Sequence, residues 1–149
     1  MKLVIQCVSE ASCVIDNKEY SSIKRGYMVL VGIDIEDTEE TVLKMANKFI
    51  KLRINPDEND KINLSIKDIN GEVLSISQFT LLGNVKKSNR PGFENAMKGD
   101  NAKHLYEYFN ELLIKEGIPV KTGVFGADMK IHLINDGPLT FTLNSKEDL

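Results

Sequence analysis

The chain has 149 residues, of which 42% are hydrophobic and 28% are charged. These values are typical of a globular protein and argue against disorder, collagen and coiled-coil composition. Nineteen basic residues against 22 acidic ones give a formal charge of −3, which argues against a protein that coats nucleic acid through a global positive field, although a local basic patch is allowed. The length predicts one domain over residues 1–149.

Cysteine content and hydropathy limit the cellular setting. Cys7 and Cys13 are too few for a disulfide framework or a zinc site, so we expect two buried, reduced thiols. The longest apolar stretch, Tyr27–Ile33, has seven residues, whereas a membrane helix needs about 20. We therefore expect a cytoplasmic protein with no membrane partner, and no cluster of ligands indicates a metal ion or a cofactor.

The first third of the chain reads as strands followed by a helix. β-Branched residues between turn signals predict strands at Lys2–Val8, Ala11–Ile15, Glu19–Ile23 and Tyr27–Ile33. Asp37 followed by Glu40 resembles a capping box, which predicts that a helix begins there. Apolar residues then recur at helical spacing, at Val42, Leu43, Ala46, Phe49 and Ile50.

The rest of the chain mixes strands with one more helix. Ile62, Leu64 and Ile66 alternate with polar residues, Asn70-Gly71 predicts a hairpin turn, and Glu72–Leu82 predicts a long strand. A polar loop precedes a second helix, for which Asp100 is the expected cap and Gly117 the expected end. Two strands flanking a turn at Asn135–Pro138, and then a frayed tail, are expected at the end. Strands and helices that do not alternate regularly predict a single mixed domain of α/β or α+β class.

Familiar catalytic motifs are missing. The Gly123–Gly126 segment lacks the spacing and the following Lys-Ser or Lys-Thr of a phosphate-binding loop. His104 falls in the second predicted helix and His132 on a strand, where surface or packing roles are favoured over catalysis. No serine lies in a G-x-S-x-G elbow.

Two polar segments stand out against this background. The strand that contains Val73–Ile76 becomes polar at Ser77-Gln78-Phe79-Thr80, so it is either leaving the core for a rim or cleft, or simply ending. Side chains alternate along a strand, so we expect Ser77 and Phe79 on one face and Gln78 and Thr80 on the other. The second segment, Asn135–Thr140, has standard turn residues, but about 5–6% of X–Pro bonds in folded proteins are cis, usually at constrained positions.

Together these segments resemble the D-aminoacyl-tRNA deacylase family, the chiral-proofreading hydrolases of translation. The resemblance covers nearly the whole chain, through the strings Val4-Ile5-Gln6, Ser77–Leu81, Arg90-Pro91, Leu105–Phe109, Thr122–Met129 and Asn135–Thr140. It implies layered β-sheets that form a barrel-like core with two main helices on one side. It also implies a homodimer that needs no cofactor and hydrolyses the ester between a D-amino acid, or glycine, and the 3′-terminal adenosine of tRNA.

The resemblance also implies roles for particular residues. Ser77, Gln78, Phe79 and Thr80 of one subunit would line the active site. Gly137-Pro138 of the other subunit, joined by a cis bond, would enter that site and reject L-amino acids. Phe125 and Met129 would contribute to substrate binding and chiral selection. The substrate's own 2′-hydroxyl would assist the attack of water, while the backbone near Phe79 and Thr80 holds the carbonyl oxygen, so Thr80 would shape the pocket rather than act as nucleophile.

One position departs from the family pattern. The family usually has arginine after Ile-Gln in the first strand, where it helps to hold the Gly-Pro element, and this chain has Cys7. A thiol cannot make the charged hydrogen bonds of a guanidinium group. The residues that fix Gly137-Pro138 are therefore not identified by the resemblance.

Lys86, Lys87 and Arg90 follow the Ser77–Leu81 motif on the same predicted loop. They are placed to meet phosphates at the tRNA acceptor end, and a solvated loop without a ligand is the equally favoured alternative. No DNA partner is expected.

Two other functions also stay open. One is a dimeric module that binds RNA ends or a small ligand without turnover. The other is an ester hydrolase with Ser77 or Thr80 as nucleophile, which lacks an evident base.

Overall fold

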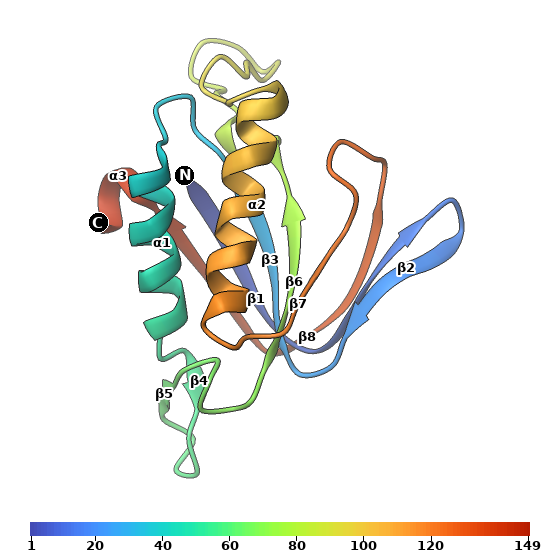
Figure 1. Cartoon of the computed structure of the whole chain (residues 1–149), viewed down its shortest axis with the longest axis vertical. Coiled ribbons are helices and arrows are strands. Elements are labelled where there is room, and N and C mark those ends of the chain that lie inside the picture. The colour runs from blue at the N-terminus through green and yellow to red at the C-terminus, as the bar shows by residue number, and fades with distance from the viewer.

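The computed structural model describes residues 1–149 as a bent, barrel-like sheet with its two long helices on one side (Figure 1). The predicted mixed α+β class and the predicted placement of the helices are thereby confirmed. In chain order the elements are β1 (Lys2–Ile15), β2 (Lys18–Ile23), β3 (Gly26–Gly32), α1 (Glu39–Lys51), β4 (Asn55–Pro56), β5 (Ile62–Leu64), β6 (Glu72–Ser77), the 3₁₀ helix η1 (Phe79–Leu82), α2 (Gly99–Lys115), β7 (Val120–Thr122), β8 (Lys130–Asn144) and α3 (Ser145–Asp148).

The main sheet is built around β1, and its path runs β2-β1-β3-β6-β7. The first part of β1 pairs with β3 and the second part with β2, both antiparallel. β8 lies antiparallel to nearly the whole length of β1 along its other edge. The β3–β6 and β6–β7 pairs are parallel, so the helices α1 and α2 belong to the crossover connections that parallel pairing requires.

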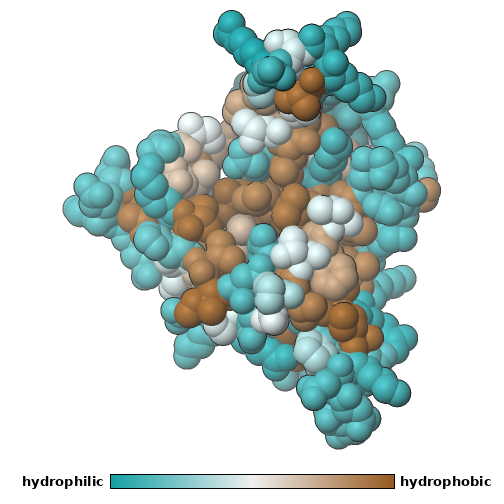
Figure 2. Space-filling view, turned by 180° about the vertical axis from the view of Figure 1, so that it is seen from behind, coloured by the Kyte–Doolittle hydropathy of each residue, from teal (hydrophilic) through white to brown (hydrophobic).

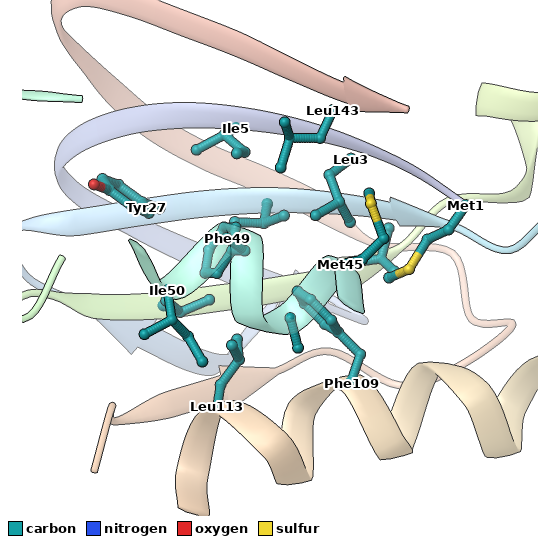
Figure 3. Packing of buried hydrophobic residues seen from close by; sticks show 14 of the residues in the cluster. Met1, Leu3, Ile5, Tyr27, Met45, Phe49, Ile50, Phe109, Leu113 and Leu143 are labelled. Atoms are coloured by element: carbon teal, nitrogen blue, oxygen red, sulfur yellow. The ribbon is translucent and has the colours of Figure 1, made fainter. Parts of the chain in front are cut away.

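The larger core lies between the sheet and the two long helices. Side chains alternate along β3, so Tyr27, Val29 and Val31 point toward the helices. The ring of Phe49 on α1 packs edge-on against Tyr27 at 5.8 Å and against Phe109 of α2 at 5.6 Å between ring centroids. Figure 3 shows these rings among the aliphatic side chains of β1 and β8. This aromatic contact joins both helices to the sheet.

The opposite face of the sheet carries a smaller cluster that no helix covers. Its buried members are Val8, Ala11, Cys13, Ile23, Met28, Leu74 and Ile76. The half-buried side chains packed against it are Ile15, Leu30, Met129, Ile131 and Leu133. Figure 2 shows a broad apolar region on this side of the molecule. The side of the sheet opposite the helices, called the back face below, therefore exposes apolar surface.

Several predicted strands have different bounds. The two predicted strands from Lys2 to Ile15 are one strand, whose pairing with β8 shifts register on either side of Val8. Asn70-Gly71 does not form a hairpin, because β6 pairs parallel with β3 rather than with the preceding segment. The predicted strand containing Ile66 is limited to Ile62–Leu64, which pairs with β4.

The helix ends also differ from the predictions. The N-cap of α1 is Thr38 rather than Asp37, and its hydroxyl accepts the Thr41 N–H at 3.3 Å. The Asp37 carboxylate instead accepts a hydrogen bond from the Met1 ammonium group at 2.6 Å. α2 begins at Gly99 without a side-chain cap, so Asp100 lies in its first turn. The predicted frayed tail contains α3.

Leu43 is exposed rather than part of the predicted apolar stripe of α1. The two cysteines are buried and unpaired, as predicted. No helix is long and apolar enough to cross a membrane.

The position of the α1 cap gives a stability prediction. Thr38→Ala removes the side-chain acceptor for the Thr41 N–H and should lower the free energy of unfolding by about 1 kcal/mol. Asp100→Ala in the first turn of α2 removes no side-chain cap and should have a smaller effect. Urea denaturation followed by circular dichroism compares the two, and a larger loss for Asp100→Ala would contradict the assignment of the caps.

Candidate active site

The Ser77–Thr80 motif lies where β6 ends and the chain turns into η1. The Gln78 N–H donates to the Val31 carbonyl at 2.8 Å, which continues the β3–β6 pairing by one residue. The turn packs against Gly32 at the end of β3, where an added Cβ would lie 2.6 Å from Leu82 Cδ2. The absence of a side chain at Gly32 therefore allows the chain to fold over β3 instead of extending β6. The prediction of a strand to Leu82, with Ser77 and Phe79 on one face, is wrong for this reason.

The turn exposes both backbone donors and an aromatic ring. Phe79 and Thr80 begin η1, so their N–H groups have no acceptor within the helix. The Phe79 side chain is 53% exposed and packs edge-on against Phe93 at 5.1 Å between ring centroids. The Gln78 side-chain amide donates to the Thr80 hydroxyl. Ser77 is half-buried beneath this rim.

Gly137-Pro138 lies on a protrusion from β8 rather than in a hairpin turn. Thr140 pairs with Gln6 and Asn135 pairs with Val8, so residues 136–139 bulge out opposite Cys7 alone. The predicted turn between two strands is therefore a bulge within one strand. The Gly137-Pro138 bond is cis, as predicted from the resemblance, and both residues are exposed.

The base of this bulge is held by polar side chains. The Gln6 side-chain oxygen accepts hydrogen bonds from the Asn135 amide and from the Thr140 hydroxyl. The Leu139 N–H donates to Asn135 Oδ1 at 3.2 Å. Sequence reasoning did not identify this network. Its only signal is Gln6, a polar side chain within an apolar strand.

The structure does not bring the two segments together within one chain. Ser77 is in register with Val31, Val31 with Leu3, and Leu3 with Leu143 on β8. These three steps between strands span about 14 Å, and Pro138 lies five residues farther along β8, or about 16 Å. The separation is therefore on the order of 20 Å along the sheet, which is too far for one small substrate group to contact both.

Phe125 and Met129 lie at the same end of the sheet as Ser77–Thr80. The loop that contains them follows β7, whose Thr122 pairs with Ser75 of β6. The Phe125 ring packs against Tyr106 at 5.9 Å between centroids. Met129 packs against the back-face cluster. Both side chains are half-buried, so each has surface available to a ligand.

Lys86, Lys87 and Arg90 are exposed on the loop between η1 and α2. The loop is closed by reciprocal backbone hydrogen bonds between Asn84 and Gly92, at 2.8 and 2.9 Å. None of the three cations makes an ion pair. Figure 1 shows this loop at the same end of the molecule as the start of α2.

The histidines and thiols do not form a nucleophile–base pair with the motif. His104 Nε2 lies 2.7 Å from Glu39 Oε1 and links α2 to α1 at the surface, and His132 is exposed on β8. Burial, with a smaller contribution from Asp136, raises the pKa of Cys7 to about 11, so its thiol is neutral near pH 7. No histidine or carboxylate is hydrogen-bonded to the Ser77 or Thr80 hydroxyl.

Known proteins resemble this chain over nearly its full length. Residues 4–144 match the family described as D-Tyr-tRNA(Tyr) deacylase. A protein of Geotalea daltonii named D-aminoacyl-tRNA deacylase is 50% identical over 145 residues, which is 97% of each chain. The protein of that name from Bacillus velezensis is 51% identical over 147 residues, covering 99% of this chain and all of that one.

Solved structures share the fold of this chain over nearly its full length. A structure titled "c-Myc DNA Unwinding Element Binding Protein" has a TM-score of 0.91 and 41% identity, and covers 97% of this chain and 98% of that one. A probable eukaryotic D-amino acid tRNA deacylase shares the fold, with a TM-score of 0.81 at 19% identity over 95% of this chain and 97% of that one. Matches over nearly the full length, in sequence and in fold, show that the chain belongs to the D-Tyr-tRNA(Tyr) deacylase family.

Proposed function

We propose that the protein hydrolyses the ester between a D-amino acid, or glycine, and the 3′-terminal adenosine of tRNA. The observation that carries this proposal is the Ser77–Thr80 turn, which presents two free backbone N–H groups at an exposed rim in a member of this family. Relatives about 50% identical to this chain are named D-aminoacyl-tRNA deacylase. Such an activity proofreads the chirality of aminoacyl-tRNA in the cytoplasm.

The site suits a reaction that needs little from a protein nucleophile. In the proposed step, water attacks the ester carbonyl carbon, and the substrate's vicinal 2′-hydroxyl assists. The N–H groups of Phe79 and Thr80 hold the negative oxygen that develops, and each such donor contributes several kcal/mol to a preorganised site. The bond between the carbonyl carbon and the ribose 3′-oxygen then breaks, and the proton that the attacking water loses ends on the 3′-oxygen. The products are a free amino acid and tRNA with a free 3′-hydroxyl group.

The exposed Phe79 ring is suited to holding the terminal nucleotide. A nucleobase can stack on an exposed aromatic ring without sequence preference, and Phe93 supports this ring from behind. Stacking there would place the ribose ester beside the free N–H groups of the same turn. The Phe79 side chain therefore positions the substrate, while its backbone contributes to the chemistry.

A second copy of the chain would complete the site. The Gly137-Pro138 bulge is on the order of 20 Å from Ser77–Thr80 in the same chain. Both residues of the bulge are exposed, as are Phe79 and Thr80 of the turn. The apolar back face supplies a surface on which two copies can associate (Figure 2). We therefore propose a homodimer in which the bulge of one subunit enters the site of its partner.

The proposed role of the bulge is to reject L-amino acids. The carbonyl groups of Gly137 and Pro138 can accept hydrogen bonds from the substrate ammonium group. They would then occupy the space that an L side chain requires, whereas glycine has no side chain to exclude. Phe125 and Met129 would contact the side chain of a D-amino acid.

A binding module without turnover is the second candidate function. One neighbour at 41% identity is titled as a protein that binds a DNA element, so duplex DNA belongs among the ligands tested alongside RNA ends. A serine or threonine hydrolase is less favoured, because no base contacts Ser77 or Thr80.

The decisive experiment compares aminoacyl esters that differ only in configuration. The purified protein should release D-tyrosine from D-tyrosyl-tRNA and glycine from glycyl-tRNA, while L-tyrosyl-tRNA persists for at least about 100-fold longer. Ester loss is followed by acid precipitation of labelled aminoacyl-tRNA. Binding of tRNA or duplex DNA without loss of any ester would instead support the binding module.

Thr80→Ala tests whether the Thr80 side chain takes part in the chemistry. The variant keeps the backbone N–H at position 80, so kcat/KM for D-tyrosyl-tRNA should fall by less than about 10-fold. A loss of several orders of magnitude in a folded variant would identify the hydroxyl as nucleophile or base. Thr142→Ala, at an exposed position of β8 outside the proposed site, is the control.

Mixed dimers test whether the site is shared between subunits. Thr80→Trp should block the site from one side, and Gly137→Val should displace the bulge, because a Cβ at Gly137 would lie 2.8 Å from Leu139 Cγ. Refolding the two inactive variants together should restore about a quarter of the wild-type activity, since half of the dimers are mixed and each has one intact site. No recovery, with mixed dimers present by mass spectrometry, would place the site within one subunit.

The basic loop should contribute to tRNA affinity but not to selectivity. Lys86→Ala, Lys87→Ala and Arg90→Ala should each lower the slope of log affinity against log salt by about 0.7–0.9. The losses should be similar for different tRNAs, because phosphates carry no sequence information, and D-over-L discrimination should not change. Lys61→Ala at the exposed β4–β5 turn is the control. Unchanged slopes for all three variants would show that the loop is not a tRNA contact.

A further inference from the structure

We propose that Arg25 is a positioning residue for the Gly137-Pro138 bulge and that it acts through the Asp136 carboxylate across a small cavity. This inference rests on the proposed function, in which the bulge selects the configuration of the substrate. The hydrogen bonds at the base of the bulge do not hold its tip.

The tip of the bulge has no partner of its own. The network around Gln6 holds Asn135 and Thr140 at the two ends of the bulge. Residues 136–138 have no place in the β1–β8 register and no side-chain hydrogen bonds. A segment that must distinguish two configurations at one carbon atom needs a support within reach of this tip.

A cavity of about 100 Å³ lies directly behind the tip. Its lining includes Asp136 and Gly137 from the bulge, and Arg25 and Gly26 from the turn into β3. Cys7, which also lines it, belongs to β1, the strand that pairs with both β3 and β8. The cavity exists because four residues of β8 bulge out opposite Cys7, whose short side chain does not fill the space. The cavity therefore separates the tip from the turn between β2 and β3.

The Arg25 side of the cavity is rigid. The Arg25 carbonyl accepts the Glu72 N–H at 3.1 Å. Gly26 lies so close to the Glu72 backbone, at a φ of +159°, that no side chain would fit there. The start of the Arg25 side chain is thus fixed relative to the sheet, while its guanidinium group can move across the cavity.

The charges facing the cavity are complementary. Arg25 is the only cationic residue that lines it and Asp136 is the only acidic one. Both act on the buried Cys7 thiol, whose pKa Asp136 raises and Arg25 lowers, so both charges lie within Coulombic reach of the same atom. Neither side chain makes an ion pair in this structure, with the other or with a third residue, so both are available to each other across the cavity. A guanidinium group has five N–H donors in a planar fork that matches a carboxylate.

The test measures selectivity rather than activity alone. Arg25→Ala and Asp136→Asn should each lower the D-over-L ratio of kcat/KM by about 10-fold, with a smaller change in the rate on D-tyrosyl-tRNA. The double variant should lose no more than either single variant, because both act through one contact. Arg25→Lys keeps the charge but not the fork and should lie between Arg25→Ala and wild type. Lys24→Ala removes the adjacent exposed cation, which does not line the cavity, and should keep the wild-type ratio.

A second readout does not depend on catalysis. Labelling with ¹⁵N-glycine gives signals from ten residues, and the Gly137 signal is identified by its loss in Gly137→Ala. Arg25→Ala should shift the Gly137 signal, whereas Lys24→Ala should not. The inference would be overturned if the losses in the D-over-L ratio multiplied in the double variant. It would also be overturned if the Gly137 signal did not shift in Arg25→Ala. If the wild-type protein hydrolyses no ester, the proposed function fails, and the Gly137 signal alone then decides whether Arg25 positions the bulge.

Discussion

The pairing of β1 along both of its edges is the constraint on which the structure depends. One edge meets β3 and then β2, and the other meets β8 over nearly the whole strand. The row through Leu3 leads across β3 to Ser77, while the row through Gln6 leads to the base of the Gly137-Pro138 bulge. A slip of one residue in β1 would exchange its buried and exposed faces, so packing of the core also fixes where both candidate segments lie.

Hydrophobic periodicity was sufficient to predict most helices and strands, but not how they are joined. Lys2–Val8 and Ala11–Ile15 are predicted as two strands although they form one, because polar residues at a bulge have the same types as polar residues at a turn. Asn135–Pro138 is predicted as a turn between two strands for the same reason, although it belongs to a bulge within β8. The end of β6 depends on Gly32 of a neighbouring strand, and no local pattern contains that information. Asp37 looked like a helix cap, but its carboxylate binds the Met1 ammonium group, a contact between distant parts of the sequence.

The candidate site was even less accessible to local reasoning. The residue types of Ser77–Thr80 suggest a hydroxyl nucleophile, whereas the structure shows no base beside them and instead shows free backbone N–H groups. Backbone donors belong to every sequence, so only the fold reveals where they are unpaired. The resemblance to a family identified the segments. It did not indicate that Gln6 holds the base of the bulge, or that Cys7 and Arg25 line a cavity beside it.

The pairing of Lys2 with Asn144 has a consequence for how the protein is made. Within residues 1–149, β1 is synthesised before every other strand and β8 after all of them, so one edge of β1 has no partner until β8 has been made. Contacts between such distant residues slow folding, because a long loop must close before the pairing can stabilise it. An unpaired apolar edge is also a template for aggregation in the meantime. The strand that ends this interval is the one that carries Gly137-Pro138, so a ribosome that has not yet finished β8 has produced neither a closed sheet nor a segment able to discriminate between substrates.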